Sequence, residues 1–417
     1  MLTNKERLLA LMDRYALDGV VAATPENVLY MSGFASWKQR NYRQGDSQVS
    51  VLFPRDPAQS PALLISSGDE AYASHQDIWI KEIYTYGKHE KAKPPAGVEL
   101  TPEEKRFVSL LDVNPKGPRH EEALVQLIRE KALGKARIGI DQSGLTEGTI
   151  ETLTALLPGA SFLRASSFFL NVRMVKTDGE VERLRQTANL NQRAAAAVLE
   201  RCQVGAAEGE LAAAYGGEVA KAGGQVSWLH LAASRGGNFP PLENRILKKG
   251  DIVRMDMGCR LQGYNADTCR SGCIGPPTDR QRKLYDTLQA GVLKSVEAVR
   301  PGILPSQLFE IMLSTIRAAG HPGFTRHFVG HTIGLEAREF PFALGPIKEV
   351  NDPFLPATTD VLLEPGMTIN LESSSHELGW GSVSVEYSVV VTEKGYEHFI
   401  PAVQMLYSLP LQHQNPL

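Results

Sequence analysis

The first 165 residues alternate short apolar runs with segments of helical periodicity. The apolar run at 19–23 has the length of a buried strand, and it follows a helical pattern over 8–17. Further elements are predicted at 51–53, 62–65 and 137–141 (strands) and at 120–131 (a helix). This alternation is typical of an α/β domain, which we place at residues 1–165. The proline-rich segment 87–117 is predicted to be a long surface insertion.

The hydrophobic pattern changes near residue 172. Helices are predicted at about 180–203 and 208–222, and two more amphipathic stretches occupy 284–299 and 308–316. Strand-like hairpins lie between and after these helices. Helices packed on an antiparallel sheet define an α+β domain, which we place at residues 172–417.

The segment 251–272 carries two acids in a predicted hairpin. Asp256 and Asp267 lie equally far from a turn centred between Leu261 and Gln262. We therefore expect them to face each other across the two strands. Like charges placed opposite each other are destabilising unless a cation lies between them.

A second pair of acids interrupts two apolar strands near the C-terminus. Glu372 and Glu386 end runs in which apolar and polar residues alternate, and they are symmetric about Gly379. A single acid on a hairpin is usually solvated or caps a turn. Two pairs of acids on apolar strands favour a buried charged site instead.

A fifth candidate residue, His331, has small or apolar neighbours at Gly330, Ile333 and Gly334. A histidine in such surroundings is often simply a hydrogen-bonded core residue. Combined with four carboxylates, one imidazole suits divalent Mn, Fe, Co or Zn, and there are enough oxygens to bridge two ions. The cysteines are a weaker alternative as ligands, because no C-x-x-C pair is present and buried free thiols are commoner.

Composition narrows the functional classes. The 417 residues include 44 Lys and Arg and 47 Asp and Glu, so the net charge is −3, which argues against a nucleic-acid binder or a polybasic membrane patch. The N-terminus lacks the apolar core of a signal peptide, and no apolar run has the length of a transmembrane helix. Four cysteines do not make a disulfide scaffold. We expect a cytoplasmic protein.

These segments together resemble the pita-bread metallopeptidases, the family of prolidase, aminopeptidase P, methionine aminopeptidase and the non-peptidase creatinase. The resemblance lies in D-x-G at 256–258, A-D-T-x-R at 266–270, G-H-x-I-G-L at 330–335, and the strands that carry Glu372 and Glu386. PENVLYMSGF at 25–34 and LNVRMVKTDGEVERLR at 170–185 extend it over nearly the whole chain.

The resemblance implies a creatinase/prolidase-like N-terminal domain followed by a pita-bread catalytic domain. It also implies two divalent metal ions (Mn, Co, Zn or Fe) and a homodimer. Asp256 would hold one ion, His331 and Glu372 the other, and Asp267 and Glu386 would bridge them; Glu372 would also act as general base. Trp37 is a candidate for contact with the second subunit, or else an ordinary surface or core aromatic.

Two positions depart from the peptidase pattern. Phe239 stands near the place of one family histidine, and Arg338 replaces the histidine of a His-Glu-x-Pro element. The loss of one such hydrogen-bond donor costs about 3–4 kcal/mol of transition-state stabilisation, so peptide hydrolysis should weaken. His230 and His327 are candidate substitutes.

Arg338 also resembles the creatinase arginine that grips a substrate carboxylate. A guanidinium binds a carboxylate in bidentate fashion, although a structural ion pair with Glu336 or Glu339 would equally explain it. The hypothesis is therefore a dinuclear C–N hydrolase for a small carboxylate-bearing substrate or dipeptide. The alternatives are a creatinase-like hydrolase, a lyase with an extra carboxylate near Gly258, and a catalytically silent binding module.

Overall fold

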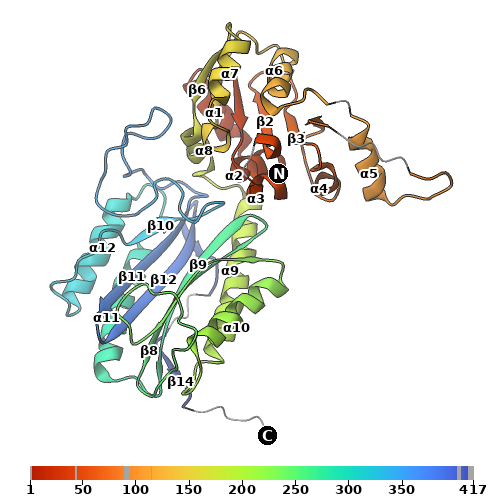
Figure 1. The fold of residues 1–417 in the computed structure, drawn as a ribbon. Helices are drawn as coiled ribbons and strands as arrows, with labels where there is room; N and C mark the ends of the chain where they lie inside the picture. The colour runs from red at the N-terminus through yellow and green to blue at the C-terminus, as the bar shows by residue number, and fades with distance from the viewer. Residues whose placement is uncertain (1, 43–44, 89–93, 114, 402–404, 412–417) are drawn as a thin grey trace. The chain divides into compact units, whose positions relative to one another are not determined.

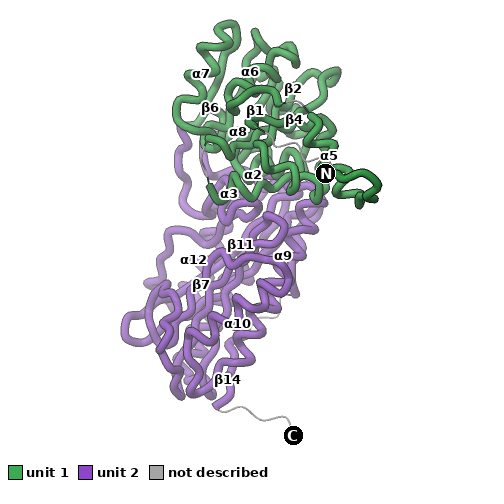
Figure 2. Tube along the Cα trace, turned by 45° about the vertical axis from the view of Figure 1, so that its right-hand side comes forward, with its two compact units in different colours: residues 1–173, 352–355 green, residues 174–351, 356–417 purple. Residues whose placement is uncertain are grey.

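The computed structural model describes the chain except residues 1, 43–44, 89–93, 114, 402–404 and 412–417. It divides into two compact units (Figure 2): residues 1–173 with 352–355, and residues 174–351 with 356–417. Each unit has its own buried apolar core.

The first unit is built on a six-stranded mixed sheet in the order β4-β3-β2-β1-β5-β6. β1 pairs antiparallel to β2 and parallel to β5. The strands are β1 (Gly19–Ala22), β2 (Ser50–Pro54), β3 (Ala62–Ser66), β4 (Glu82–Tyr86), β5 (Arg137–Ile140) and β6 (Ser161–Arg164). The helices are α1 (Lys5–Arg14), α2 (Pro25–Ser32), α3 (Trp37–Tyr42), α4 (Glu70–Ser74), α5 (Pro102–Leu111), α6 (His120–Glu130), α7 (Thr149–Leu156) and α8 (Ser166–Arg173).

The α/β prediction for this region is confirmed, with strands at each predicted place. The expected surface insertion at 87–117 contains a helix that we did not predict, α5, although residues 89–93 and 114 within it lie outside the described residues. α5 begins at a capping box formed by Thr101 and Glu104. Trp37 is 45% exposed and lies in an aromatic group with Tyr42 and Tyr72.

The second unit holds two four-stranded sheets, β14-β9-β8-β7 and β10-β11-β12-β13, which contact each other through β12, β8 and β9. Helices α9 and α10 pack on the first sheet, and α11 packs on the second beside α12 (Figure 1). The strands are β7 (Gln225–Ala233), β8 (Ile252–Leu261), β9 (Tyr264–Ile274), β10 (Gly330–Thr332), β11 (Thr368–Glu377), β12 (Gly381–Thr392), β13 (Gly395–His398) and β14 (Tyr407–Leu409). The helices are α9 (Asp178–Leu199), α10 (Glu208–Lys221), α11 (Asp279–Glu297) and α12 (Pro305–Ala318).

This arrangement confirms the α+β prediction, with one exception to antiparallel pairing: β14 runs parallel to β9. Capping boxes start two of the helices, α9 at Thr177 and α11 at Thr278. Each box satisfies amide groups that the first helical turn would otherwise leave unpaired, and so favours a helix start at these positions. Among the described residues, no helix is both long and apolar enough to cross a membrane.

The two acidic hairpins differ in how well their register was predicted. Glu372 pairs directly with Glu386, as expected. The expected pairing of Asp256 with Asp267 is wrong: Asp256 lies opposite Cys269, and Asp267 lies opposite Gly258. The turn is made by Gln262 and Gly263, both at positive φ, so its centre falls one residue later than we placed it. The two aspartates are therefore diagonal neighbours on one face of the sheet.

Candidate metal centre

Strands of both sheets in the second unit bring the five predicted ligands to one cavity of about 1140 Å³. Its lining includes all four predicted acids and the predicted histidine, namely Asp256, Asp267, Glu372, Glu386 and His331. Two come from the β8–β9 hairpin, two from the β11–β12 hairpin, and the histidine from the short strand β10. Residues that lie up to 130 positions apart in the sequence thus line a common space.

Three of the five form the tightest group. One ligand atom from each of Asp267, His331 and Glu386 lies within 4.8 Å of the others. His331 Nε2 is 3.2 Å from Asp267 Oδ2, and its Nδ1 is 3.0 Å from the backbone oxygen of Thr332. A carbonyl oxygen only accepts, so Nδ1 carries a proton, and a neutral His331 presents the Nε2 lone pair to Asp267. Two lone pairs at this distance need a proton or a metal ion between them.

The charges in this group also favour a cation. Burial, together with the negative charges of neighbouring acids, raises the pKa of Asp267 to about 6 and raises that of Glu386 well above its usual range. The Asp267 Oδ1 atom is buried and has no hydrogen-bond partner among the described residues. A divalent ion would satisfy this oxygen and keep the acids ionised. The donor set of carboxylates and one imidazole therefore fits a transition-metal ion.

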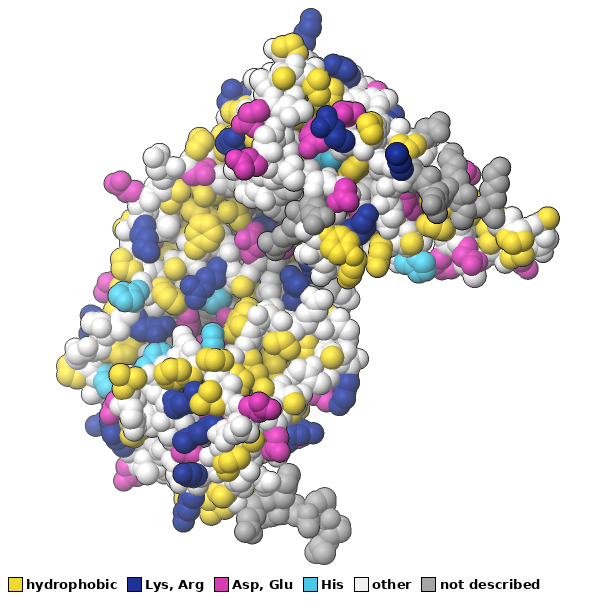
Figure 3. All heavy atoms as spheres, in the orientation of Figure 1, with side chains coloured by type: hydrophobic (Ala, Val, Ile, Leu, Met, Phe, Trp, Pro, Cys, Tyr) yellow, Lys and Arg dark blue, Asp and Glu magenta, His cyan; other side chains and the backbone are white. Residues whose placement is uncertain are grey.

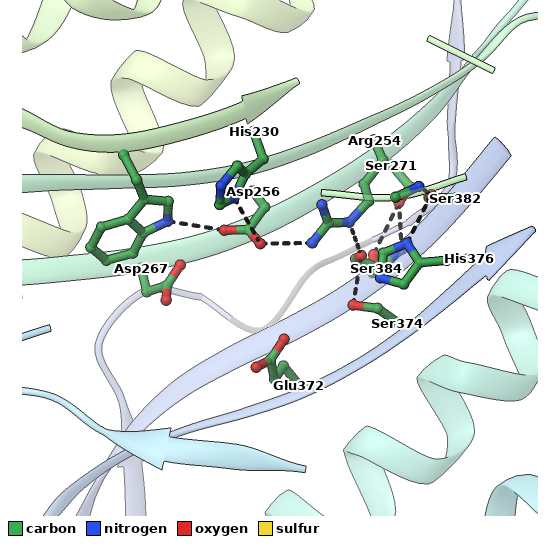
Figure 4. A network of polar contacts seen from close by, with 12 residues as sticks. His230, Arg254, Asp256, Asp267, Ser271, Glu372, Ser374, His376, Ser382 and Ser384 are labelled. Atoms are coloured by element: carbon green, nitrogen blue, oxygen red, sulfur yellow. Dashed lines mark hydrogen bonds and ion pairs between the residues drawn. The ribbon is translucent and has the colours of Figure 1, made fainter. Parts of the chain in front are cut away.

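Asp256 lies beside this group in a different environment (Figure 4). Its Oδ1 accepts a hydrogen bond from Trp228 Nε1 at 3.0 Å, and its Oδ2 accepts one from Arg254 Nη2 at 2.7 Å. His230, directly opposite on β7, has its Nδ1 3.7 Å from Oδ2. Burial would raise the pKa of Asp256, but His230, Arg254 and Trp228 together lower it. Asp256 is thus held as a carboxylate.

Arg254 is the centre of a polar network that our sequence analysis missed. Its Nε donates to Ser384 Oγ, which in turn donates to Ser374 Oγ at 2.8 Å (Figure 4). The backbone amide of Ser384 donates to Ser271 Oγ at 2.9 Å, so the network joins β8, β9, β11 and β12. A usable signal was present: Arg254 is two residues before Asp256 and therefore points to the same face of β8.

Two more arginines line the cavity wall, Arg326 from the loop before β10 and Arg338 from the segment after it. Arg338 and Arg326 have their guanidinium carbons 4.9 Å and 5.3 Å from the ring centroid of Phe328. His327 also lines the cavity, whereas Phe239 is 38% exposed and stacks on the guanidinium of Arg235. Of the two positions that depart from the peptidase pattern, only Arg338 therefore faces the cavity.

Glu339 is not the partner of Arg338. Its carboxylate accepts a 2.8 Å hydrogen bond from Lys176 Nζ, and both side chains are 1% exposed. No ion pair joins Arg338 to another described residue, which leaves its guanidinium available to a ligand. Glu339 also accepts a backbone hydrogen bond from Thr332 Oγ1, next to His331. The buried ion pair therefore fixes the loop that presents the histidine.

The four cysteines are buried free thiols. Burial raises the pKa of Cys202, Cys259 and Cys273 to about 12, and that of Cys269 well above its usual value. A thiol, unlike a thiolate, is a poor nucleophile and a poor metal ligand. The cysteines are packing residues in this fold.

Comparisons with known proteins identify the family of this chain. Residues 182–393 match the family model described as Metallopeptidase family M24, and residues 5–175 match the one described as Creatinase/Prolidase N-terminal domain. The chain is 24% identical over 395 residues to a Xaa-Pro dipeptidase of Pyrococcus furiosus, covering 94% of this chain and 95% of that protein. It is 22% identical over 396 residues to an uncharacterized peptidase of Bacillus subtilis, again covering 94% of this chain and 95% of the other.

Solved structures show the same fold. The prolidase from Pyrococcus horikoshii superposes with a TM-score of 0.69 at 21% identity, covering 96% of this chain and 99% of that one. A Xaa-Pro dipeptidase from Bacillus anthracis gives 0.73 at 22% identity, covering 96% and 98%. The fold and the carboxylate–histidine site define a metal-dependent hydrolase. The chain belongs to metallopeptidase family M24, with a creatinase/prolidase N-terminal domain.

Proposed function

We propose that this chain uses two divalent ions to hydrolyse a C–N bond in a small carboxylate-bearing substrate, in the manner of a Xaa-Pro dipeptidase. The observation that carries the proposal is the cavity whose lining holds the five candidate ligands together with Arg338, a residue that forms no ion pair with the described part of the chain. Relatives named Xaa-Pro dipeptidase support a dipeptide-sized substrate. Mn, Co, Zn and Fe all suit the donors.

The proposed roles follow from the contacts of each side chain. A pair of ions bound by these ligands would lower the pKa of a bound water and polarise the scissile carbonyl. Asp256 is proposed to hold one ion, and His331 with Glu372 the other, with Asp267 and Glu386 between them. Glu372 takes the proton of the attacking water as general base.

Arg338 is proposed to orient the substrate through its carboxylate. His327 lines the same cavity. We propose that it supplies the hydrogen-bond donor lost where Phe239 and Arg338 stand in place of the two family histidines. Excluding water from this cavity would strengthen each of these interactions. We also propose a homodimer in the cytoplasm, with Trp37 in the subunit contact; its exposed aromatic group supports that role.

The lyase alternative finds no support at Gly258. A Cβ atom there would lie 2.3 Å from the indole of Trp228, so an added carboxylate at this position would clash. The creatinase-like alternative differs from our proposal only in the substrate. A substrate panel separates them: Xaa-Pro dipeptides, longer Xaa-Pro peptides and small carboxylated amides, each with Mn, Co, Zn and Fe. Absence of metal-dependent turnover and of bound metal would favour the binding module.

Substitution of Arg338 by alanine tests the carboxylate grip. We expect KM for carboxylated substrates to rise about tenfold or more, since a charge-assisted hydrogen bond is lost, while the metal content stays the same. Arg300→Ala, an exposed arginine elsewhere in the same unit, is the control and should leave KM unchanged. Steady-state kinetics with elemental analysis makes the measurement, and an unaltered KM in Arg338→Ala would reject this role.

A further inference from the structure

A second guanidinium faces the cavity next to Arg338. Arg326 and Arg338 both lie against the ring of Phe328, and their distances from its centroid place the two guanidinium carbons no more than about 10 Å apart. Arg326 precedes β10, and Arg338 follows it. Figure 3 shows His side chains near Lys or Arg side chains on the face of the second unit that it displays.

Arg326 has one ion pair among the described residues, a long one with Glu372. The Nη2 atom of Arg326 is 3.7 Å from Glu372 Oε2, beyond hydrogen-bond distance, and its Nε is buried with no hydrogen-bond partner among the described residues. Arg338 has no ion pair with any described residue. The two like charges repel each other, and an anion between or beside them would reduce that repulsion.

Among the described acids of the cavity, Glu372 pairs with Arg326 and none pairs with Arg338. Every acidic residue that lines it is one of the four carboxylates of the candidate metal centre. The rest of the described lining is neutral, histidine or arginine. Around Phe328, Arg326 therefore shares its acid with the candidate metal centre, and Arg338 has no ion pair among the described residues, so this part of the wall favours an anionic ligand.

From this geometry we propose that Arg326 and Arg338 form a subsite for two carboxylates, so that the substrate is an amide whose acidic part is a short dicarboxylate. This inference rests on the proposed function and names its substrate class. Each guanidinium offers a planar pair of donors that matches one carboxylate. Two separate guanidiniums, each lying against the same ring, suit two carboxylates on one short chain.

Direct binding tests the subsite without turnover. Isothermal titration of the full-length, metal-loaded protein would compare glutarate with pentanoate, which has the same number of carbons and one carboxylate fewer. We expect glutarate to bind at least about tenfold more tightly to the unmodified protein. Arg326→Gln and Arg338→Gln should each remove that preference, Arg326→Lys should retain part of it, and Arg300→Gln should leave it unchanged.

Several results would overturn the subsite. Equal affinities for the two acids would do so, as would a preference for glutarate that survives in Arg326→Gln. Weaker binding of pentanoate in both glutamine variants would indicate instead that both arginines grip one carboxylate. Thermal unfolding of each variant checks that it is folded. If Arg326→Gln does not fold, the conservative variant Arg326→Lys still tests the role of Arg326. The titration measures binding without turnover. A negative substrate panel would therefore count against the proposed function and not against the subsite, and equal binding of the two acids would count against the subsite and not against the proposed function.

Discussion

Replacing Glu372 by glutamine is expected to lower kcat about a thousandfold, because the amide cannot accept the proton of the attacking water. Glutamine keeps the shape of the side chain and one oxygen that can still face a cation. The side chain of Glu372 is 11% exposed and lines the cavity, so the change should leave the strand pairing with Glu386 intact. Single-turnover and steady-state kinetics on the metal-loaded enzyme measure the effect.

A matched control exists on the same strand. Glu377 ends β11, and its exposed carboxylate pairs with Arg280 away from the cavity lining. Glu377→Gln should therefore change kcat by no more than about twofold, as expected of a surface substitution. If Glu372→Gln kept a tenth or more of the activity with its metal bound, Glu372 would not be the general base.

Removal of Lys176 is expected to destabilise the second unit by about 3–5 kcal/mol, since it leaves Glu339 buried without its partner. Lys176→Met retains the length and apolar volume of the side chain, so the lost charge is the main change. Scanning calorimetry, following the transition of the second unit, makes this measurement. Burial raises the pKa of Glu180 nearby to about 7 and the charge of Lys176 lowers it, so the loss of Lys176 also disfavours the ionised form of Glu180.

The double variant Lys176→Met, Glu339→Leu should recover at least half of the lost stability, because no unpaired charge remains. Lys294 and Glu297 form a control pair of the same type whose side chains are 63% and 61% exposed. Lys294→Met should change the stability by less than about 1 kcal/mol. A similarly small effect for Lys176→Met would show that the buried pair does not hold the loop of His331.

The sequence predicts most of the architecture because period and capping are local properties. Short patterns account for both α9, which Thr177 caps, and the pairing of Glu372 with Glu386. Predicting the partner of Asp256 required knowledge of the turn type. The two-residue turn at Gln262 and Gly263 moves the centre of the hairpin by one residue and so changes that partner. One residue of error in a turn changes every pair in a hairpin.

The local sequence pattern does not predict contacts between segments that lie far apart in the chain. Lys176 and Glu339 are 163 residues apart, and nothing local to either one indicates that they are buried together. The arginines on Phe328 are likewise brought together by the loops on either side of β10. Arg254 is different, because it lies two residues before Asp256 on the same strand. The strand period alone predicts that both side chains lie on one face of the sheet.

The most direct test is anomalous diffraction from crystals grown with manganese, recorded at wavelengths on both sides of the metal absorption edge. We predict strong anomalous peaks among the side chains of Asp256, Asp267, His331, Glu372 and Glu386. Peaks absent from this cavity under saturating manganese, or found only elsewhere in the molecule, would contradict the metal centre on which the proposed function depends.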